Sequence, residues 1–173
     1  SYGRLPVPVA ACDLVAISAH KIHGPKGIGA LWVREGQEPL PLIHGGGQEG
    51  GLRSGTLSPA LCVGFGAAAR LALERREADL DHVRRLHDAA LGRFRQRGWQ
   101  LNGPVAGRYP GNLNLRREGL DVARLMADVR DVAFSAGSAC ASGSGRPSHV
   151  LRAIGLTDAE ARSSIRLGFG RYT

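Results

Sequence analysis

Two short apolar runs and the polar segment between them dominate the first third of the chain. Residues 14–17 and 30–33 are apolar and include β-branched side chains. This pattern predicts two strands, and the uniformly apolar run 14–17 predicts that the first strand is buried. The segment 24–29 combines glycines with a proline, which predicts a stiff turn. The polar residues that follow the first strand therefore lie at its carboxyl end, where open α/β sheets place their ligands.

A helical period follows from residue 60 to about residue 97. Apolar side chains recur there at helical spacing, at Leu80, Val83, Ala90 and Phe94. Ser58 and Pro59 suit a helix start, as a capping hydroxyl and a proline at the first helical position. The pattern predicts one long helix, and a helix of this length usually joins two lobes of a globular protein.

Short elements alternate in the last third of the chain. The pattern predicts strands at 99–101, 112–115, 132–135 and 164–169, and helices at 121–129, 147–155 and 158–161. Asp121 suits a helix cap. This order of strands and helices predicts a small α/β domain.

Composition limits the function classes. The chain has 173 residues, is 43% hydrophobic and contains 25 glycines, which fits a globular α/β protein. The net charge of +8 permits binding to RNA or acidic proteins, but the arginines are scattered and aromatics are few, so no direct nucleic-acid partner is expected. Three widely spaced cysteines support neither a disulfide framework nor a metal site, and a reducing compartment is the default. No apolar run is long enough to span a membrane.

Both lysines of the chain, Lys21 and Lys26, fall in the same strand-to-turn segment, whereas all other basic side chains of the Lys and Arg type are arginines. Arginine replaces lysine in most ion pairs, but only lysine condenses with an aldehyde. The clustering indicates amine chemistry, although chance also explains it. Ser18 and His20 would bind a phosphate while Lys21 reaches an aldehyde on the same molecule.

Three further places have both a functional and a structural interpretation. The glycine-rich stretch 44–55, with Thr56 after it, is either a flexible surface loop or a loop presented to a phosphate or a partner subunit. Cys140 lies among small residues, so it is either a thiolate on a movable loop or an inert thiol. Arg166 lies in a predicted strand and is either a clamp for a carboxylate or part of a structural ion pair.

Four ordered segments carry a resemblance to a known family. Residues 18–31, 45–56, 135–140 and 163–167 resemble the corresponding segments of cysteine desulfurases of the NifS/IscS type, which are pyridoxal-phosphate enzymes of the class V aminotransferase group. Two positions depart from the pattern. His23 stands where a tyrosine is common, and Gly51 where an arginine is frequent.

The resemblance implies an α/β protein of the pyridoxal-phosphate-dependent transferase fold type I. Residues 1–65 would be the remainder of the large cofactor-binding domain, and 66–173 the linking helix and the small C-terminal domain. It implies that Lys21 binds pyridoxal 5'-phosphate, that Ser18 and His20 contact it, and that Thr56 binds the cofactor phosphate of the neighbouring protomer in a homodimer. The groups that hold the cofactor ring belong to a preceding half in this family, so this chain alone is expected to be incomplete and inactive.

The implied activity is the removal of sulfur from L-cysteine in the cytoplasm. Arg166 would bind the substrate carboxylate, and Cys140 would attack the substrate sulfur and carry a persulfide. The products would be L-alanine and a persulfide passed to an iron–sulfur scaffold or a tRNA-thiolation protein. Two alternatives remain open: another class V aminotransferase or lyase, and a non-catalytic interaction module.

Overall fold

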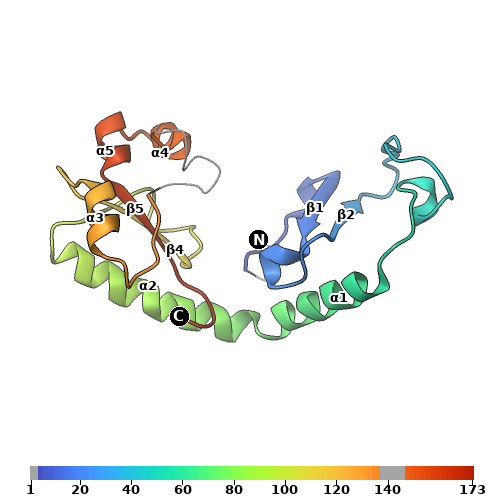
Figure 1. Ribbon diagram of the computed structural model, residues 1–173, viewed down its shortest axis with the longest axis horizontal. Coiled ribbons are helices and arrows are strands. Elements are labelled where there is room, and N and C mark those ends of the chain that lie inside the picture. The colour runs from blue at the N-terminus through green and yellow to red at the C-terminus, as the bar shows by residue number, and fades with distance from the viewer. Residues whose placement is uncertain (1–3, 137–146) are drawn as a thin grey trace. The chain divides into compact units, whose positions relative to one another are not determined.

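The structure, a computed structural model, describes residues 4–136 and 147–173, and the chain divides into two compact units, Ser1–Glu77 and Ala78–Thr173 (Figure 1). In chain order, the elements up to the division are η1 (Val9–Ala11), β1 (Leu14–Ser18), η2 (Ala19–Ile22), β2 (Gly29–Val33), η3 (Glu49–Gly51) and α1 (Pro59–Glu74). Helix α2 (Arg76–Arg95) begins two residues before the division and continues past it. The elements that follow are β3 (Gln100–Leu101), β4 (Asn112–Arg116), α3 (Val122–Asp128), α4 (His149–Ala153), α5 (Asp158–Arg162) and β5 (Ser164–Gly168). The assignment of 1–65 and 66–173 to a large and a small domain stays a prediction.

The first unit contains an antiparallel hairpin of β1 and β2, in which Leu14 pairs with Val33 and Ser18 with Gly29. Both predicted strands are present. The predicted burial of β1 is wrong, because its residues alternate between exposed and half-buried, and Leu14 is 49% exposed. A strand is buried only where other layers cover both faces of its sheet, and the described residues supply no such layers to this hairpin.

Helix α1 packs against η2. Ala19 and Ile22 are the buried residues of η2, and Ala68 is the buried residue of α1. Gly24 lies close to both, since a Cβ there would come within 3.1 Å of Ala68 Cβ. The turn after β1 is therefore held firmly on the helix.

The predicted single helix over residues 60–97 is wrong in one respect. It is interrupted at Arg75, whose backbone N–H bonds to the carbonyls of Leu71 and Leu73 and which has φ −98° and ψ 0°. Neither proline nor glycine is present at this break, so the sequence pattern gave no signal for it. Pro59 begins α1 as predicted, but the Ser58 side chain makes no capping hydrogen bond.

The second unit is a three-stranded antiparallel sheet in the order β3-β4-β5 with α2 and α3 packed on it. The core consists of buried side chains from these elements: Leu91, Trp99, Leu113, Leu115, Val122 and Ile165. Asp121 caps α3 as predicted, accepting a hydrogen bond from the Arg124 N–H at 3.0 Å. The predicted strand at 132–135 is wrong, since only Ser135 pairs there, in a single bridge to Arg166. No helix in the described ranges is long and apolar enough to cross a membrane.

Candidate functional site

The short helical turn η2 presents Ser18, His20 and Lys21. Side chains three residues apart eclipse in a 3₁₀ turn, so Ala19 and Ile22 face the protein together. His20 and Lys21 lie between them and are exposed, as is Ser18 at the end of β1. Burial of two apolar residues thus fixes a hydroxyl, an imidazole and a primary amine on one exposed turn.

Backbone hydrogen bonds hold this turn in place. Gly24 N–H donates to the Ala19 carbonyl at 2.9 Å, and Ala19 N–H donates to the Ile28 carbonyl at 3.1 Å. His23 has φ +66°, a left-handed conformation that a non-glycine residue adopts at some cost. The amine of Lys21 therefore extends from a backbone that is fixed on both sides.

The glycine-rich stretch 44–55 is a folded loop with its own hydrogen bonds. Gly55 N–H donates to Gln48 Oε1 at 2.9 Å, and Gly47 N–H donates to the Ser54 hydroxyl at 3.3 Å. Ser54 is buried, whereas Thr56, directly after this hydrogen-bonded loop, is exposed. Figure 1 shows this loop well separated from η2 within the first unit. The structure therefore places Thr56 on a different surface segment from Lys21.

Arg166 lies in the middle of β5. Its backbone N–H and carbonyl both bond to Ser135, at 2.7 and 3.1 Å. The side chain is half-buried, and within residues 4–136 and 147–173 no ion-pair or hydrogen-bond partner of its guanidinium is found. A structural ion pair, the alternative role of Arg166, has no partner in the part of the chain that the structure describes.

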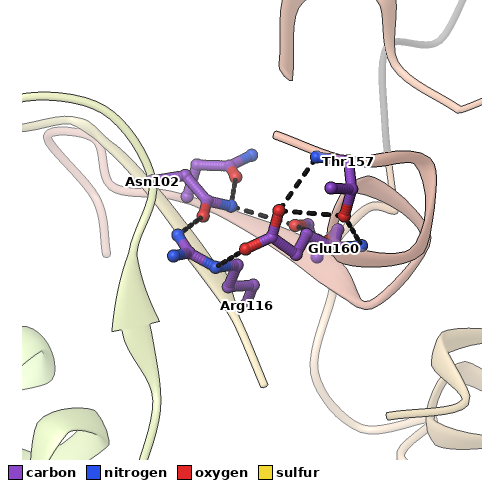
Figure 2. A network of polar contacts seen from close by, with 6 residues as sticks. Asn102, Arg116, Thr157 and Glu160 are labelled. Atoms are coloured by element: carbon purple, nitrogen blue, oxygen red, sulfur yellow. Dashed lines mark hydrogen bonds and ion pairs between the residues drawn. The ribbon is translucent and has the colours of Figure 1, made fainter. Parts of the chain in front are cut away.

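A polar network occupies the sheet face opposite the apolar core (Figure 2). Asn102 Nδ2 donates to Asn114 Oδ1 at 2.6 Å and to Ser164 Oγ at 2.9 Å, and Asn102 Oδ1 accepts from Arg116 Nη1 at 2.7 Å. Arg116 also pairs with Glu160, at 3.3 Å. This network was not predicted from the sequence, although the polar positions that alternate with leucine along β4 were a signal for it.

Glu160 joins this network to α5. Its carboxylate accepts hydrogen bonds from the Thr157 N–H and hydroxyl, both at 2.9 Å, which completes a capping box. The hydrogen bonds from Thr157, the backbone one first, lower the pKa of Glu160, and the positive charge of Arg116 adds to this. The carboxylate is therefore held in its charged form.

The structure thus brings Ser18, His20 and Lys21 together and places Thr56 and Arg166 on other segments. Cys140 lies outside the described residues. No group of three or more histidine, cysteine, aspartate or glutamate side chains suited to a metal ion is found in the described ranges. The donor set on η2 fits the two ends of pyridoxal phosphate, because an amine suits its aldehyde while a hydroxyl and an imidazole suit its phosphate.

Comparison with known proteins identifies the family. The sequence model of "Aminotransferase class-V" matches residues 2–173. The chain belongs to the class V aminotransferase family. Members of this family depend on pyridoxal phosphate.

Two class V relatives illustrate the sequence similarity. The chain is 51% identical to "Cysteine desulfurase, mitochondrial" of Eremothecium gossypii over 178 residues, covering 100% of the chain and 36% of the relative. It is 46% identical to "Cysteine desulfurase IscS" of Rickettsia prowazekii, covering 99% of the chain and 43% of the relative. The chain therefore spans about two fifths of the length of these relatives.

Solved structures of the family show the same fold. A NifS-like protein from Rickettsia africae matches with a TM-score of 0.84 at 27% identity, over 99% of this chain and 46% of that one. The structure titled "SspA in complex with cysteine" matches with a TM-score of 0.77 at 35% identity, over 98% of this chain and 48% of that one. The predicted fold class, the pyridoxal-phosphate-dependent transferase fold type I, is confirmed.

Proposed function

We propose that the protein to which this chain belongs is a cysteine desulfurase, which removes sulfur from L-cysteine and releases L-alanine. The observation that carries this proposal is the η2 turn, on which buried Ala19 and Ile22 fix Lys21 beside Ser18 and His20. The relatives named as cysteine desulfurases at 46–51% identity support the choice of reaction within the family.

The η2 residues would bind the cofactor. Ser18 and His20 hold the phosphate, and Lys21 binds the aldehyde carbon and later carries a proton to and from the substrate carbon. Pyridoxal phosphate, when bound, supplies an electron sink for the carbon that loses its proton. A backbone fixed by the Ala19 and Gly24 hydrogen bonds positions the amine, which lowers the entropy cost of reaching the reactive geometry.

Thr56 would serve a second copy of the protein. Thr56 is exposed and directly follows the hydrogen-bonded loop 44–55, which lies apart from η2 within the same unit (Figure 1). A phosphate contact from Thr56 therefore suits the site of a neighbouring protomer, and we infer a homodimer with shared active sites.

Arg166 would bind the substrate carboxylate. A planar guanidinium makes two parallel hydrogen bonds to a carboxylate, and this one has no ion-pair partner among the described residues. Cys140 would be the nucleophile. Its thiolate would form a bond to the substrate sulfur while the carbon–sulfur bond of the substrate breaks. The electron pair of that bond would stay with the carbon, which takes up a proton and becomes the methyl group of L-alanine, and the sulfur would stay on Cys140 as a persulfide.

The persulfide would then pass to an acceptor protein in the cytoplasm, either an iron–sulfur scaffold or a tRNA-thiolation protein. A second function within the family, another aminotransferase or lyase activity, needs no thiol at position 140. A non-catalytic interaction module needs neither Lys21 nor Cys140.

The test uses the full-length protein loaded with pyridoxal phosphate. Sulfide and alanine are measured after addition of L-cysteine and a thiol reductant. Cys140→Ser is expected to abolish sulfide release while the absorption band of the lysine-bound cofactor persists. Lys21→Ala is expected to abolish both sulfide release and this lysine-dependent band. Sulfide release that survives Cys140→Ser would refute the proposed nucleophile, and a lysine-dependent band that survives Lys21→Ala would refute the role of the amine. Lys26→Ala is the matched control and should change neither.

A further inference from the structure

The sheet register brings the side chains of Asn114 and Arg166 together. These two residues are direct partners in the antiparallel pairing of β4 with β5. Both backbone polar groups of Arg166 bond to Ser135, on the other side of β5, so Asn114 and Arg166 form a non-hydrogen-bonded pair. Opposite residues in such a pair point to the same face, with Cα atoms about 4.5 Å apart and side chains closer than in a hydrogen-bonded pair.

The network fixes which end of the Asn114 amide faces Arg166. Arg116 is only a donor, so the Asn102 atom that it contacts is the oxygen, and the other end of Asn102 is the NH₂ group. That NH₂ group donates to Asn114, which must therefore accept through Oδ1.

The position of the strands then orients the remaining end of Asn114. Asn102 N–H bonds to the Asn114 carbonyl, so Asn102 lies beside β4 on the β3 side. The side chain of Asn102 reaches across β4, since its NH₂ group also donates to Ser164 Oγ of β5 at 2.9 Å. Asn114 Oδ1 points to this NH₂ group, so Nδ2, at the other end of the amide, faces away from Asn102, on the sheet face that Asn114 shares with Arg166. No acceptor for Nδ2 is found in the part of the chain that the structure describes.

Two side chains that lie opposite each other on one face of the sheet thus carry donors without an acceptor among the described residues. In the described ranges the buried unpartnered side-chain atoms are His87 Nε2 and Arg108 Nε, so the donors of Asn114 and Arg166 are open to solvent and to a ligand. We propose that Asn114 Nδ2 donates to the same substrate carboxylate as Arg166, and that Asn102 is a positioning residue that keeps the NH₂ end of Asn114 turned toward it.

This inference rests on the proposed role of Arg166 and extends it. A carboxylate has two oxygens with several lone pairs, so it accepts the fork of Arg166 and one further N–H at the same time. A carboxylate satisfies both donors, whereas an ammonium group, which can only donate, would leave the Asn114 amide unpaired. The inference also explains why an asparagine, rather than a serine or an apolar residue, is placed beside Arg166.

The test compares ligands with and without a carboxylate on the full-length, cofactor-loaded protein. 3-Mercaptopropionate keeps the carboxylate and thiol of cysteine but has no amine, and cysteamine keeps the amine and thiol but has no carboxylate. Asn114→Asp preserves an oxygen for Asn102 and puts a carboxylate oxygen in place of Nδ2. It is expected to weaken the binding of 3-mercaptopropionate, measured by calorimetry, by about tenfold to a hundredfold, and to change the binding of cysteamine by less than about threefold.

Asn112→Asp is the matched control, since Asn112 lies on the same face two residues earlier on β4, opposite Gly168. It should leave both affinities within about threefold of the parent. With L-cysteine as substrate, Asn114→Asp should raise KM and leave kcat within about threefold, as loss of a binding contact does. Asn114→Ser, which removes the amide without adding charge, serves if Asn114→Asp does not fold, and the same loss is expected of it.

The outcomes separate this inference from the proposed function. Unchanged binding of 3-mercaptopropionate to a folded Asn114 variant, together with weakened binding to Arg166→Leu, would overturn the role of Asn114 alone. Unchanged binding to Arg166→Leu would overturn the proposed carboxylate clamp itself, and this inference with it.

Discussion

Replacement of Asn102 by alanine tests whether the polar face of the small sheet stabilises the second unit. Asn102 is 2% exposed and makes three side-chain hydrogen bonds, to Asn114, Ser164 and Arg116. The bond from the charged Arg116 contributes about 1.5–3 kcal/mol and each neutral bond about 0.5–1.5 kcal/mol. We use the lower values, because the space left by the amide admits water and Arg116 keeps Glu160 as a partner. The expected loss of stability is about 2.5 kcal/mol.

Hydrogen exchange of the full-length protein measures this loss without requiring a single unfolding transition for the whole chain. The reporters are the backbone amides of β4 around Leu113 and Leu115, which are completely buried. A loss of about 2.5 kcal/mol corresponds to exchange that is roughly 60-fold faster. Asn112→Ala is the control, since Asn112 is exposed on the same strand, and it should change exchange by less than about threefold. The reasoning is refuted if Asn102→Ala accelerates exchange no more than Asn112→Ala does.

Three further substitutions have defined expectations. Leu113→Ala removes a completely buried core side chain and should destabilise the second unit by about 2–5 kcal/mol, seen as faster exchange throughout β4 and β5. Asp79→Asn weakens the contact with two nitrogens of Arg171, at 2.6–3.0 Å, and should lower the stability by about 1 kcal/mol because both side chains are partly exposed. Thermal unfolding measures this loss, and Asp81→Asn, which affects the more exposed pair with Arg84, should lower the stability less. Glu160→Gln concerns acid stability: because Thr157 lowers the pKa of Glu160, the carboxylate stabilises the fold above its ordinary pKa, and this contribution is lost as pH falls through the lowered pKa. The variant should therefore show a smaller loss of stability on acidification, and an unchanged pH dependence would contradict the assigned contact.

The sequence predicted much of the secondary structure, because local rules govern most of these elements. Strands β1, β2, β4 and β5 follow from apolar runs and from alternation, and the cap of α3 follows from Asp121. Two predictions failed where the sequence carries no local signal. The single pairing at Ser135 depends on contact with β5, and no proline or glycine at Arg75 marks the helix break in the sequence.

The sequence by itself determined which reactive groups are available: two lysines among basic residues that are otherwise arginines, with Lys21 just after the hydroxyl of Ser18 and the imidazole of His20 at the end of a strand. The tertiary structure decided which groups meet. Packing of η2 on α1 turns Ser18, His20 and Lys21 outward together, and the register of β4 with β5 places Asn114 beside Arg166. Asn114 and Arg166 are 52 positions apart and become neighbours only through strand pairing. Arg116 orients the amide of Asn102, which in turn orients the amide of Asn114, through hydrogen bonds between neighbouring strands. Such pairings are non-local, so no pattern within a short window of sequence specifies them.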